Sequence, residues 1–310
     1  MASEAQGSAI KNAAWLLSGG VSTAILTLIC STLVARLMDV NMYGVLQIGT
    51  SIFLFLQLAE RICHPDIVKN MLLMPNADSE KVIVSASQIM IAANFLVLLG
   101  LVTYVFWIDS AAPLLLAIPM VIGQFFRAAN GISYYYDSQL LSRKTQLNQL
   151  GGYLVGNAYR VLAAIVQPTA ILQTIYLPIC YAATAFLNLK SYKIPMAKFF
   201  RVDLNNIKII CRLSFPLFLT SIISLVLTRA DILLLGWLST PDQVSFYSNA
   251  VRLSEPWNFV SNAIINSYFP ILVSGRLEAK RSIIKELGIY SSYSLWRRSR
   301  SPSPRKWLGS

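Results

Sequence analysis

Long apolar runs recur along this chain, and they restrict its fold more than any other feature. Several exceed the roughly 18 residues that mark a candidate membrane-spanning helix. Only 13% of the residues are charged, about half the share found in soluble domains. The sequence therefore predicts an all-α polytopic membrane protein.

The apolar runs predict about eight membrane-spanning helices joined by short loops. The second expected span is short, and Arg127 interrupts the fourth after a brief uncharged stretch. The expected spans are Ala13–Ala35, Met42–Ala59, Val82–Ile108, Ala111–Asn130, Leu147–Gln167, Thr169–Leu189, Ile209–Leu238 and Pro256–Val273.

The basic residues are distributed unevenly between the two sides of this arrangement. Most of the 26 Lys and Arg residues fall in loops on one side. Cytoplasmic loops carry such an excess, so the N-terminus and the C-terminus are both expected in the cytoplasm. Since the same asymmetry accounts for the net charge of +12, no nucleic-acid partner is expected.

The span pattern divides the chain into five segments. Residues 1–12 are a cytoplasmic N-terminus, residues 13–189 form a first bundle of six transmembrane helices, and residues 190–208 are a basic cytoplasmic linker. Residues 209–275 hold the first two helices of a second bundle. Residues 276–310 form a basic cytoplasmic tail, which ends in an Arg/Ser-rich sequence that predicts disorder.

Two charged residues, Arg229 and Asp231, lie in the outer part of the seventh expected span. A charge at membrane depth costs at least ~2.5–3.5 kcal/mol on insertion scales, so it is usually retained for a function. The two residues are about 200° apart around a helix and cannot pair on one face. Each needs another partner or a water-filled cavity, unless each side chain extends to the outer interface.

A polar stripe follows the eighth expected span. Arg252 and Glu255 form an i,i+3 pair, and Asn258, Asn262 and Asn266 continue at i,i+4 spacing. Amide side chains both donate and accept hydrogen bonds, which suits sugar hydroxyl groups. The alternative is that these amides hold neighbouring helices together.

Arg160 lies deep in the fifth expected span. A buried arginine needs an anion, and a phosphate group matches the fork geometry of the guanidinium. Together with Arg36, Arg229 and Arg252, it places four cations towards the outer half of the membrane.

Motifs of soluble enzymes are absent from the sequence, including the P-loop, the GxSxG elbow and the HExxH zinc motif. The four cysteines are scattered, so neither a zinc site nor a disulfide framework is expected. We therefore expect a protein that is not an enzyme and that holds no metal and no cofactor.

Several stretches carry a resemblance to a known family. These are the opening KNAAWLL, the segment LVARLMDVNMYGVLQ at Leu33–Gln47, and the two longer stretches Leu213–Ser239 and Val244–Leu272. In them the chain resembles the polysaccharide-unit flippases of the multidrug/oligosaccharidyl-lipid/polysaccharide exporter superfamily, and among these the bacterial O-antigen translocases. The resemblance covers Lys11 to about Glu286.

The resemblance implies two bundles of six helices around a central cavity that is worked by alternating access. It implies transport of an undecaprenyl-pyrophosphate-linked oligosaccharide, the O-antigen repeat unit of lipopolysaccharide, across the bacterial inner (cytoplasmic) membrane. The expected partners are this lipid-linked oligosaccharide, membrane lipids, and the polysaccharide polymerase and chain-length proteins.

Combined with the polar residues above, the resemblance suggests three kinds of site. Arg160, Arg229 and Arg36 would attract the pyrophosphate, and the asparagine stripe Asn258, Asn262 and Asn266 would contact sugars. Asp231 or Glu255 would couple transport to an ion, because a buried carboxylate can change its protonation with the side of access.

Other functions remain open at this stage. A cation-coupled multidrug antiporter of the same superfamily would need acidic residues in the first bundle, whose helix cores hold almost none. A membrane-embedded polymerase would carry a large periplasmic loop that is missing here. Since members of the family have about twelve spans and eight are expected here, a truncated copy or a non-functional remnant is a further alternative.

Overall fold

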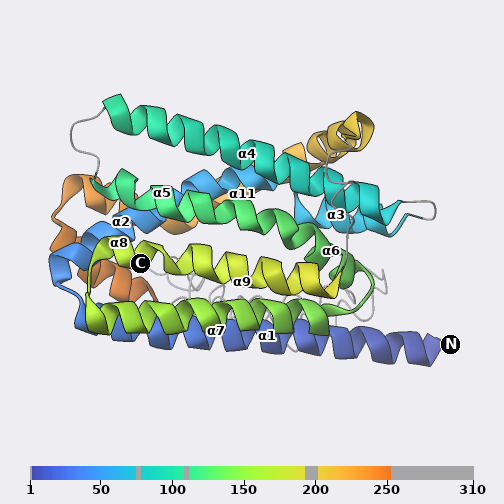
Figure 1. Cartoon of the computed structure of the whole chain (residues 1–310), viewed down its shortest axis with the longest axis horizontal. Helices are drawn as coiled ribbons and strands as arrows, with labels where there is room; N and C mark the ends of the chain where they lie inside the picture. Colours follow the sequence, from blue (N-terminus) through green and yellow to red (C-terminus); the bar gives the residue numbers. More distant parts are fainter. Residues whose placement is uncertain (1, 75–77, 108–111, 193–201, 253–310) are drawn as a thin grey trace, which may run out of the picture. The chain divides into compact units, whose positions relative to one another are not determined.

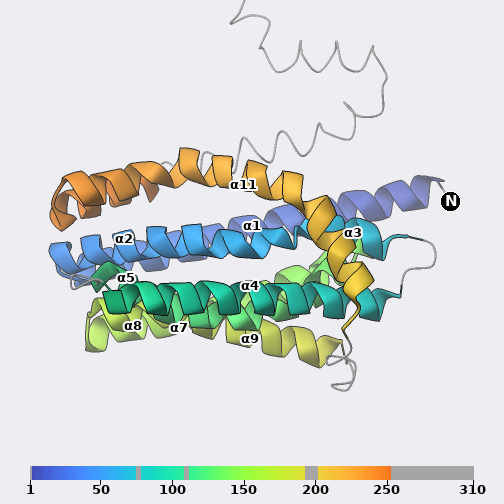
Figure 2. The same ribbon diagram turned by 90° about the horizontal axis from the view of Figure 1, so that it is seen from above.

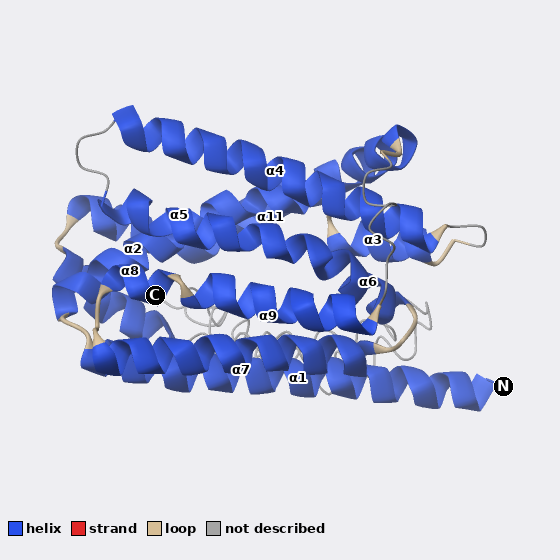
Figure 3. Cartoon of the chain, viewed as in Figure 1, coloured by secondary structure: helices blue, strands red, loops and turns tan. Residues whose placement is uncertain are grey.

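The computed structural model of this chain describes residues 2–74, 78–107, 112–192 and 202–252. All of them belong to one of the chain's two compact units, Met1–Leu253; the other is Ser254–Ser310. Every regular element in these ranges is a helix, and short connections join them (Figure 3). The helices in chain order are α1 (Ala2–Leu37), α2 (Val40–Gln57), η1 (Leu58–Ile62), α3 (Pro65–Leu72), α4 (Ser79–Trp107), α5 (Ala112–Gln124), η2 (Phe125–Ala129), α6 (Asn130–Ser138), α7 (Ser142–Val166), α8 (Ala170–Thr174), α9 (Tyr176–Ser191) and α11 (Leu204–Leu238). Residues 241–252 are helical as well.

Within the described ranges, six helical segments are long and apolar enough to cross a membrane, and each coincides with a span expected from the sequence. The chain is therefore an all-α polytopic membrane protein, as predicted. The fifth expected span corresponds to α7, which is not one of these six segments. This helix is less apolar than they are, and its first turn carries Ser142, Arg143 and Lys144. The eighth, Pro256–Val273, lies outside the described residues. The six segments are Ala14–Leu37, Val40–Leu72, Ser79–Trp107, Ala112–Ser138, Ala170–Ser191 and Leu204–Leu238.

Successive crossings run in opposite directions, which gives the unit two ends (Figure 1). The end at which α1 begins, here named the basic end, also holds the exposed cations Arg61, Lys81, Arg143, Lys144 and Lys190. The opposite end, named the far end, holds the turn between α1 and α2. The cytoplasmic position of the basic end remains a prediction.

Two of the crossings are not continuous α-helices. The second passes from α2 through the 3-10 turn η1 into α3, and the fourth passes from α5 through η2 into α6. The predicted second span, Met42–Ala59, ends inside η1, and the predicted fourth span ends where α6 begins. Both spans looked weak in the sequence because each 3-10 turn carries a charged residue, Glu60 in η1 and Arg127 in η2.

Close helix packing depends on small residues in α7. This helix lies between α1 and α9 and contacts both (Figure 1). A Cβ atom on Gly152 would lie 2.6 Å from the Cys180 carbonyl oxygen, and one on Gly156 would lie 2.8 Å from that of Tyr176. The small-xxx-small spacing of these glycines lets the two backbones approach, as is common between membrane helices.

The helix α11 bends near Pro216, which cannot donate to the carbonyl one turn earlier (Figure 2). Its first part contacts α4 and η1, with Ile210 fully buried and the Ser214 hydroxyl accepting a 3.0 Å hydrogen bond from the His64 N–H. Its second part runs along α2, where Gly236 lies against Ile48. The assignment of this helix to a second bundle remains a prediction.

The turn after α11 packs against the start of α2. Asp39 caps α2 by accepting hydrogen bonds from the N–H groups of Asn41 and Met42 at 3.0 and 3.2 Å. Next to this cap, a Cβ atom on Gly44 would overlap the Pro241 carbonyl oxygen. This close approach brings the helical residues 241–252 to the face of α2 that carries Tyr43 and Gln47.

Candidate functional site

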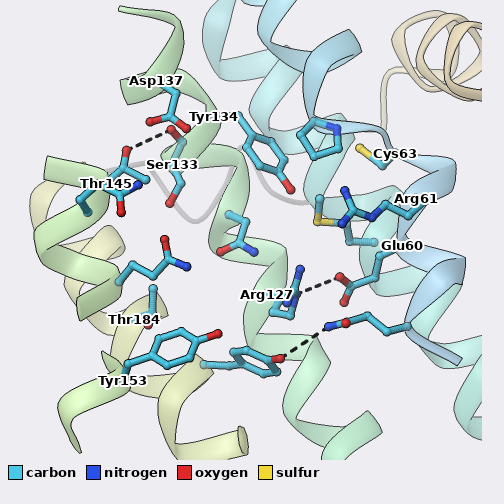
Figure 4. A pocket seen from close by; sticks show the side chains of 17 residues that line it. Glu60, Arg61, Cys63, Arg127, Ser133, Tyr134, Asp137, Thr145, Tyr153 and Thr184 are labelled. Carbon is cyan, nitrogen blue, oxygen red and sulfur yellow. Dashed lines mark hydrogen bonds and ion pairs between the residues drawn. The ribbon is translucent and has the colours of Figure 1, made fainter. Parts of the chain in front are cut away.

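A cavity of about 290 Å³ lies inside the first six crossings, with walls from η1, η2, α6, α7 and α9 (Figure 4). Most of its lining is polar but uncharged. The side chains of this kind are Gln57, Asn130, Ser133, Tyr134, Thr145, Gln146, Gln149, Tyr153, Tyr181 and Thr184.

One buried ion pair closes the deep side of this cavity. The Nε atom of Arg127 lies 2.9 Å from Oε2 of Glu60, whose side chain is only 6% exposed. The Asn94 amide donates a 3.2 Å hydrogen bond to the other oxygen of Glu60. The Arg127 guanidinium also lies over the ring of Tyr181, 5.1 Å from its centroid, and Gln57 donates to the Tyr181 hydroxyl at 3.5 Å. Figure 4 shows Arg127 and Glu60 pointing toward one another from the two 3-10 turns.

The opposite side of the cavity reaches the basic end. Asp137 forms an ion pair with Lys69 at 3.5 Å and accepts a 3.0 Å hydrogen bond from the Ser142 hydroxyl. Arg61, which also lines the cavity, is exposed. A polar solute from the basic end would therefore meet an ion pair and one exposed cation before it meets the uncharged walls.

A second polar cluster lies near the far end around Arg160, which is only 3% exposed. Its Nε atom donates to the Gln173 side-chain oxygen at 3.4 Å, and the Gln173 amide donates back to the Arg160 carbonyl at 3.2 Å. The guanidinium lies over the ring of Tyr176, 4.4 Å from its centroid. No carboxylate pairs with Arg160 among the residues that the structure describes.

Arg252 joins this cluster from the helical residues 241–252. It donates hydrogen bonds to the Tyr43 hydroxyl and, at 2.8 Å, to the Gln47 side-chain oxygen. It is also close enough to Arg160 for the two charges to repel each other. Two guanidinium groups thus share one cluster, and neither forms an ion pair with a carboxylate of residues 2–74, 78–107, 112–192 or 202–252. An anion between them would relieve both the repulsion and the cost of burial.

The other residues predicted for the site lie in different surroundings. Arg36 is exposed in the last turn of α1, and Arg229 is half-buried on α11. Asp231 is exposed and accepts a hydrogen bond from the Tyr247 hydroxyl, which raises the pKa of Tyr247. Four predicted residues lie outside the described ranges: Asn258, Asn262, Asn266 and Glu255.

Neither the cavity nor its ion pair was predicted from the sequence. Arg127 was expected only to interrupt the fourth span, and the cores of the first six expected helices hold almost no acidic residues. The structure places Glu60 and Asp137 on the cavity wall. The sequence did contain a sign of this ion pair. Glu60 directly follows one short span, Arg127 interrupts another, and the two residues carry opposite charges.

Residues 2–74, 78–107, 112–192 and 202–252 contain no group of three or more His, Cys, Asp or Glu side chains that could hold a metal ion. The four cysteines are free, three of them buried and Cys211 half-buried. No protein-family model, no curated protein and no solved structure matches this chain.

Proposed function

We propose that this chain is a flippase that moves a lipid-linked oligosaccharide with an anionic diphosphate group across the bacterial inner membrane. The observation that carries the proposal is Arg160, a guanidinium buried near the far end with no carboxylate partner in the described part of the chain. The resemblance to O-antigen translocases supplies the substrate class.

The surroundings of Arg160 favour an anion over any other partner. A buried, unpaired cation is costly in a membrane, and a second cation, Arg252, raises that cost by repulsion. Tyr43, Gln47 and Gln173 hold the two guanidinium groups in fixed positions. Two preorganised forks can each donate two parallel hydrogen bonds to phosphoryl oxygens, which suits a diphosphate.

Complementation of a bacterial strain that lacks its own O-antigen flippase tests the proposal. The chain should restore surface polysaccharide, and Arg160→Gln or Arg252→Gln should each lower it at least about tenfold, because a charged hydrogen bond contributes roughly 1.5–3 kcal/mol. Arg160→Lys should retain part of the activity, since it keeps the charge and loses the fork.

The control variant is Lys190→Gln, an exposed cation in the last turn of α9 at the basic end. It should leave surface polysaccharide unchanged. Protein amounts in the membrane are compared by immunoblot, so that loss of activity is separated from loss of protein. Wild-type polysaccharide in both arginine variants would show that the cluster does not bind the substrate.

One observation favours a second candidate, a cation-coupled antiporter. Glu60 is a buried carboxylate on the wall of a polar cavity, the kind of residue that such antiporters need. In proteoliposomes, a proton or sodium gradient would then drive export of an organic cation, and Glu60→Gln would abolish it. Transport of the lipid-linked glycan without such export would leave the flippase as the function.

A further inference from the structure

The polar cavity in the first six crossings offers more hydrogen-bonding groups than it uses within the protein. The side chains of Gln146, Gln149 and Tyr153 line it and make no hydrogen bond with any described residue; of the two amides, that of Gln146 packs against Gly19 of α1. Each amide can donate two hydrogen bonds and accept two, and the tyrosine hydroxyl can do both. The cavity walls can therefore form hydrogen bonds with a ligand that carries many hydrogen-bond donors and acceptors.

The charges at the deep side of the cavity disfavour a charged ligand. Two ion pairs account for four of the charges around the cavity, Glu60 with Arg127 and Asp137 with Lys69, and Arg61 is exposed and pairs with no described carboxylate. Both oxygens of Glu60 are already engaged, one by Arg127 at 2.9 Å and the other by Asn94 at 3.2 Å. A cation would have to break this ion pair, and an anion would have to displace Glu60 from Arg127.

The volume of the cavity and its aromatic residues further limit the class of ligand that it can bind. The volume of about 290 Å³ lies at the lower edge of the roughly 300–1,000 Å³ typical of small-molecule sites. It therefore admits a single ring rather than a chain of several. Tyr153 and Tyr181 enter from neighbouring helices, and Figure 4 shows the Tyr153 ring at one wall. An aromatic ring can cover the apolar face of a ligand while its hydroxyl bonds the rim.

We propose that this cavity is a saccharide-binding site that takes one uncharged sugar ring of a glycan. The amide of Gln149 bonds the ring hydroxyls, and Tyr153 bonds one hydroxyl and covers a carbon face. The ion pair between Glu60 and Arg127 forms the floor. The site is distinct from the Arg160 cluster and from the asparagine stripe that the sequence suggested for sugar contact.

The sugar would reach this site from the basic end, past exposed Arg61. The identity of the glycan as the carried substrate rests on the proposed function. Sugar binding itself does not, because it can be measured on the purified protein without any transport. Failure of one therefore leaves the other standing.

The full chain in detergent is titrated with free glucose, galactose, rhamnose and N-acetylglucosamine, and binding is followed by saturation-transfer NMR. At least one neutral sugar should bind. Gln149→Leu and Tyr153→Phe should each weaken it roughly three- to tenfold, since each removes a neutral hydrogen bond. The double variant should lose more than either single one.

Two controls separate the site from the rest of the protein. Gln139→Leu makes the same change at an exposed position outside the cavity, and Lys190→Gln removes an exposed cation in the last turn of α9. Both should bind the sugar as the wild type does. Gel filtration and thermal unfolding confirm that all variants are folded.

Three outcomes would overturn the proposal. The first is that no neutral sugar binds at tens of millimolar, and the second is that Gln149→Leu and Tyr153→Phe bind as tightly as the wild type. The third is that tetraphenylphosphonium or pyrophosphate displaces the sugar from the cavity or binds there in its place. That result would assign the cavity to an organic cation or to an anion.

Discussion

Single polar residues in this bundle are tolerated at membrane depth because other side chains surround them. Glu60 contacts Arg127 and Asn94, and Arg127 contacts a tyrosine ring in addition. Removing one partner of a buried pair leaves the other charge uncompensated, which costs more than the pair itself contributes. A substitution of one partner should therefore destabilise the protein mainly because it leaves the other charge buried and unpaired.

The variant Glu60→Gln should destabilise the chain by about 3 kcal/mol, at the lower edge of the range for buried pairs. The low value is expected because the Arg127 side chain is 25% exposed and can take up some water. Unfolding of the purified protein by SDS measures the effect.

The double variant Glu60→Gln with Arg127→Gln should recover part of that loss, because neither charge is then unpaired. A double-mutant cycle quantifies the coupling. Strictly additive single effects would mean that the two residues do not interact in the membrane.

For single polar residues, the sequence predicted burial in the membrane better than it predicted hydrogen-bonding partners. The position of Arg160 in an apolar span predicted its burial. Its partner Gln173 follows a break after Val166, where α7 ends and the chain turns back. The direction of that turn depends on tertiary packing, so the contact cannot be derived from spacing alone. Likewise, the i,i+3 spacing predicted a pair between Arg252 and Glu255. The contacts described for Arg252 are with Tyr43 and Gln47.

At the scale of elements, apolar runs located the crossings, but they could not reveal where helices change type. The turns η1 and η2 interrupt two crossings at Glu60 and Arg127. A 3-10 turn has no distinct periodicity over so few residues, so only its charged residues hinted at it. The tight contact of α7 with α9 also depends on single glycines rather than on hydrophobicity.

A pair of glycine substitutions tests the packing of α7. Gly156→Ala places a Cβ atom 2.8 Å from the Tyr176 carbonyl oxygen, so α7 and α9 must separate, and we expect a loss of about 1–3 kcal/mol. Gly100→Ala in α4 makes the same change where no atom lies within 4 Å. It should be neutral or stabilise the helix by up to about 1 kcal/mol.

Both glycine variants are compared by their resistance to SDS or heat in the same detergent. The change in stability should differ in sign between the two variants, although the chemical change is identical. Equal effects at the two positions would indicate that α7 and α9 do not approach as closely as described.

At the scale of the whole molecule, the described unit combines two polar sites at different depths in one apolar bundle. The polar cavity opens towards the basic end, and the Arg160 cluster lies near the far end. A glycan attached to a diphosphate carries both kinds of chemistry in one molecule. The order in which a substrate meets the two sites depends on which end faces the cytoplasm.

The excess of Lys and Arg at the basic end predicts that this end faces the cytoplasm. The test uses a chain in which the four native cysteines are replaced, with a single new cysteine at Met42, Asn70 or Gln139. All three positions are exposed; Met42 lies at the far end, and the other two lie at the basic end. None of these substitutions removes a positive charge, so the charge asymmetry is preserved.

A membrane-impermeant maleimide added to intact spheroplasts should label Met42→Cys. It should label Asn70→Cys and Gln139→Cys only after the membrane is permeabilised. The reverse pattern would place the polar cavity on the periplasmic side, and a sugar there would bind after translocation rather than before it. Labelling of all three positions in intact spheroplasts would contradict a single orientation, because the two ends lie at opposite sides of the apolar helices.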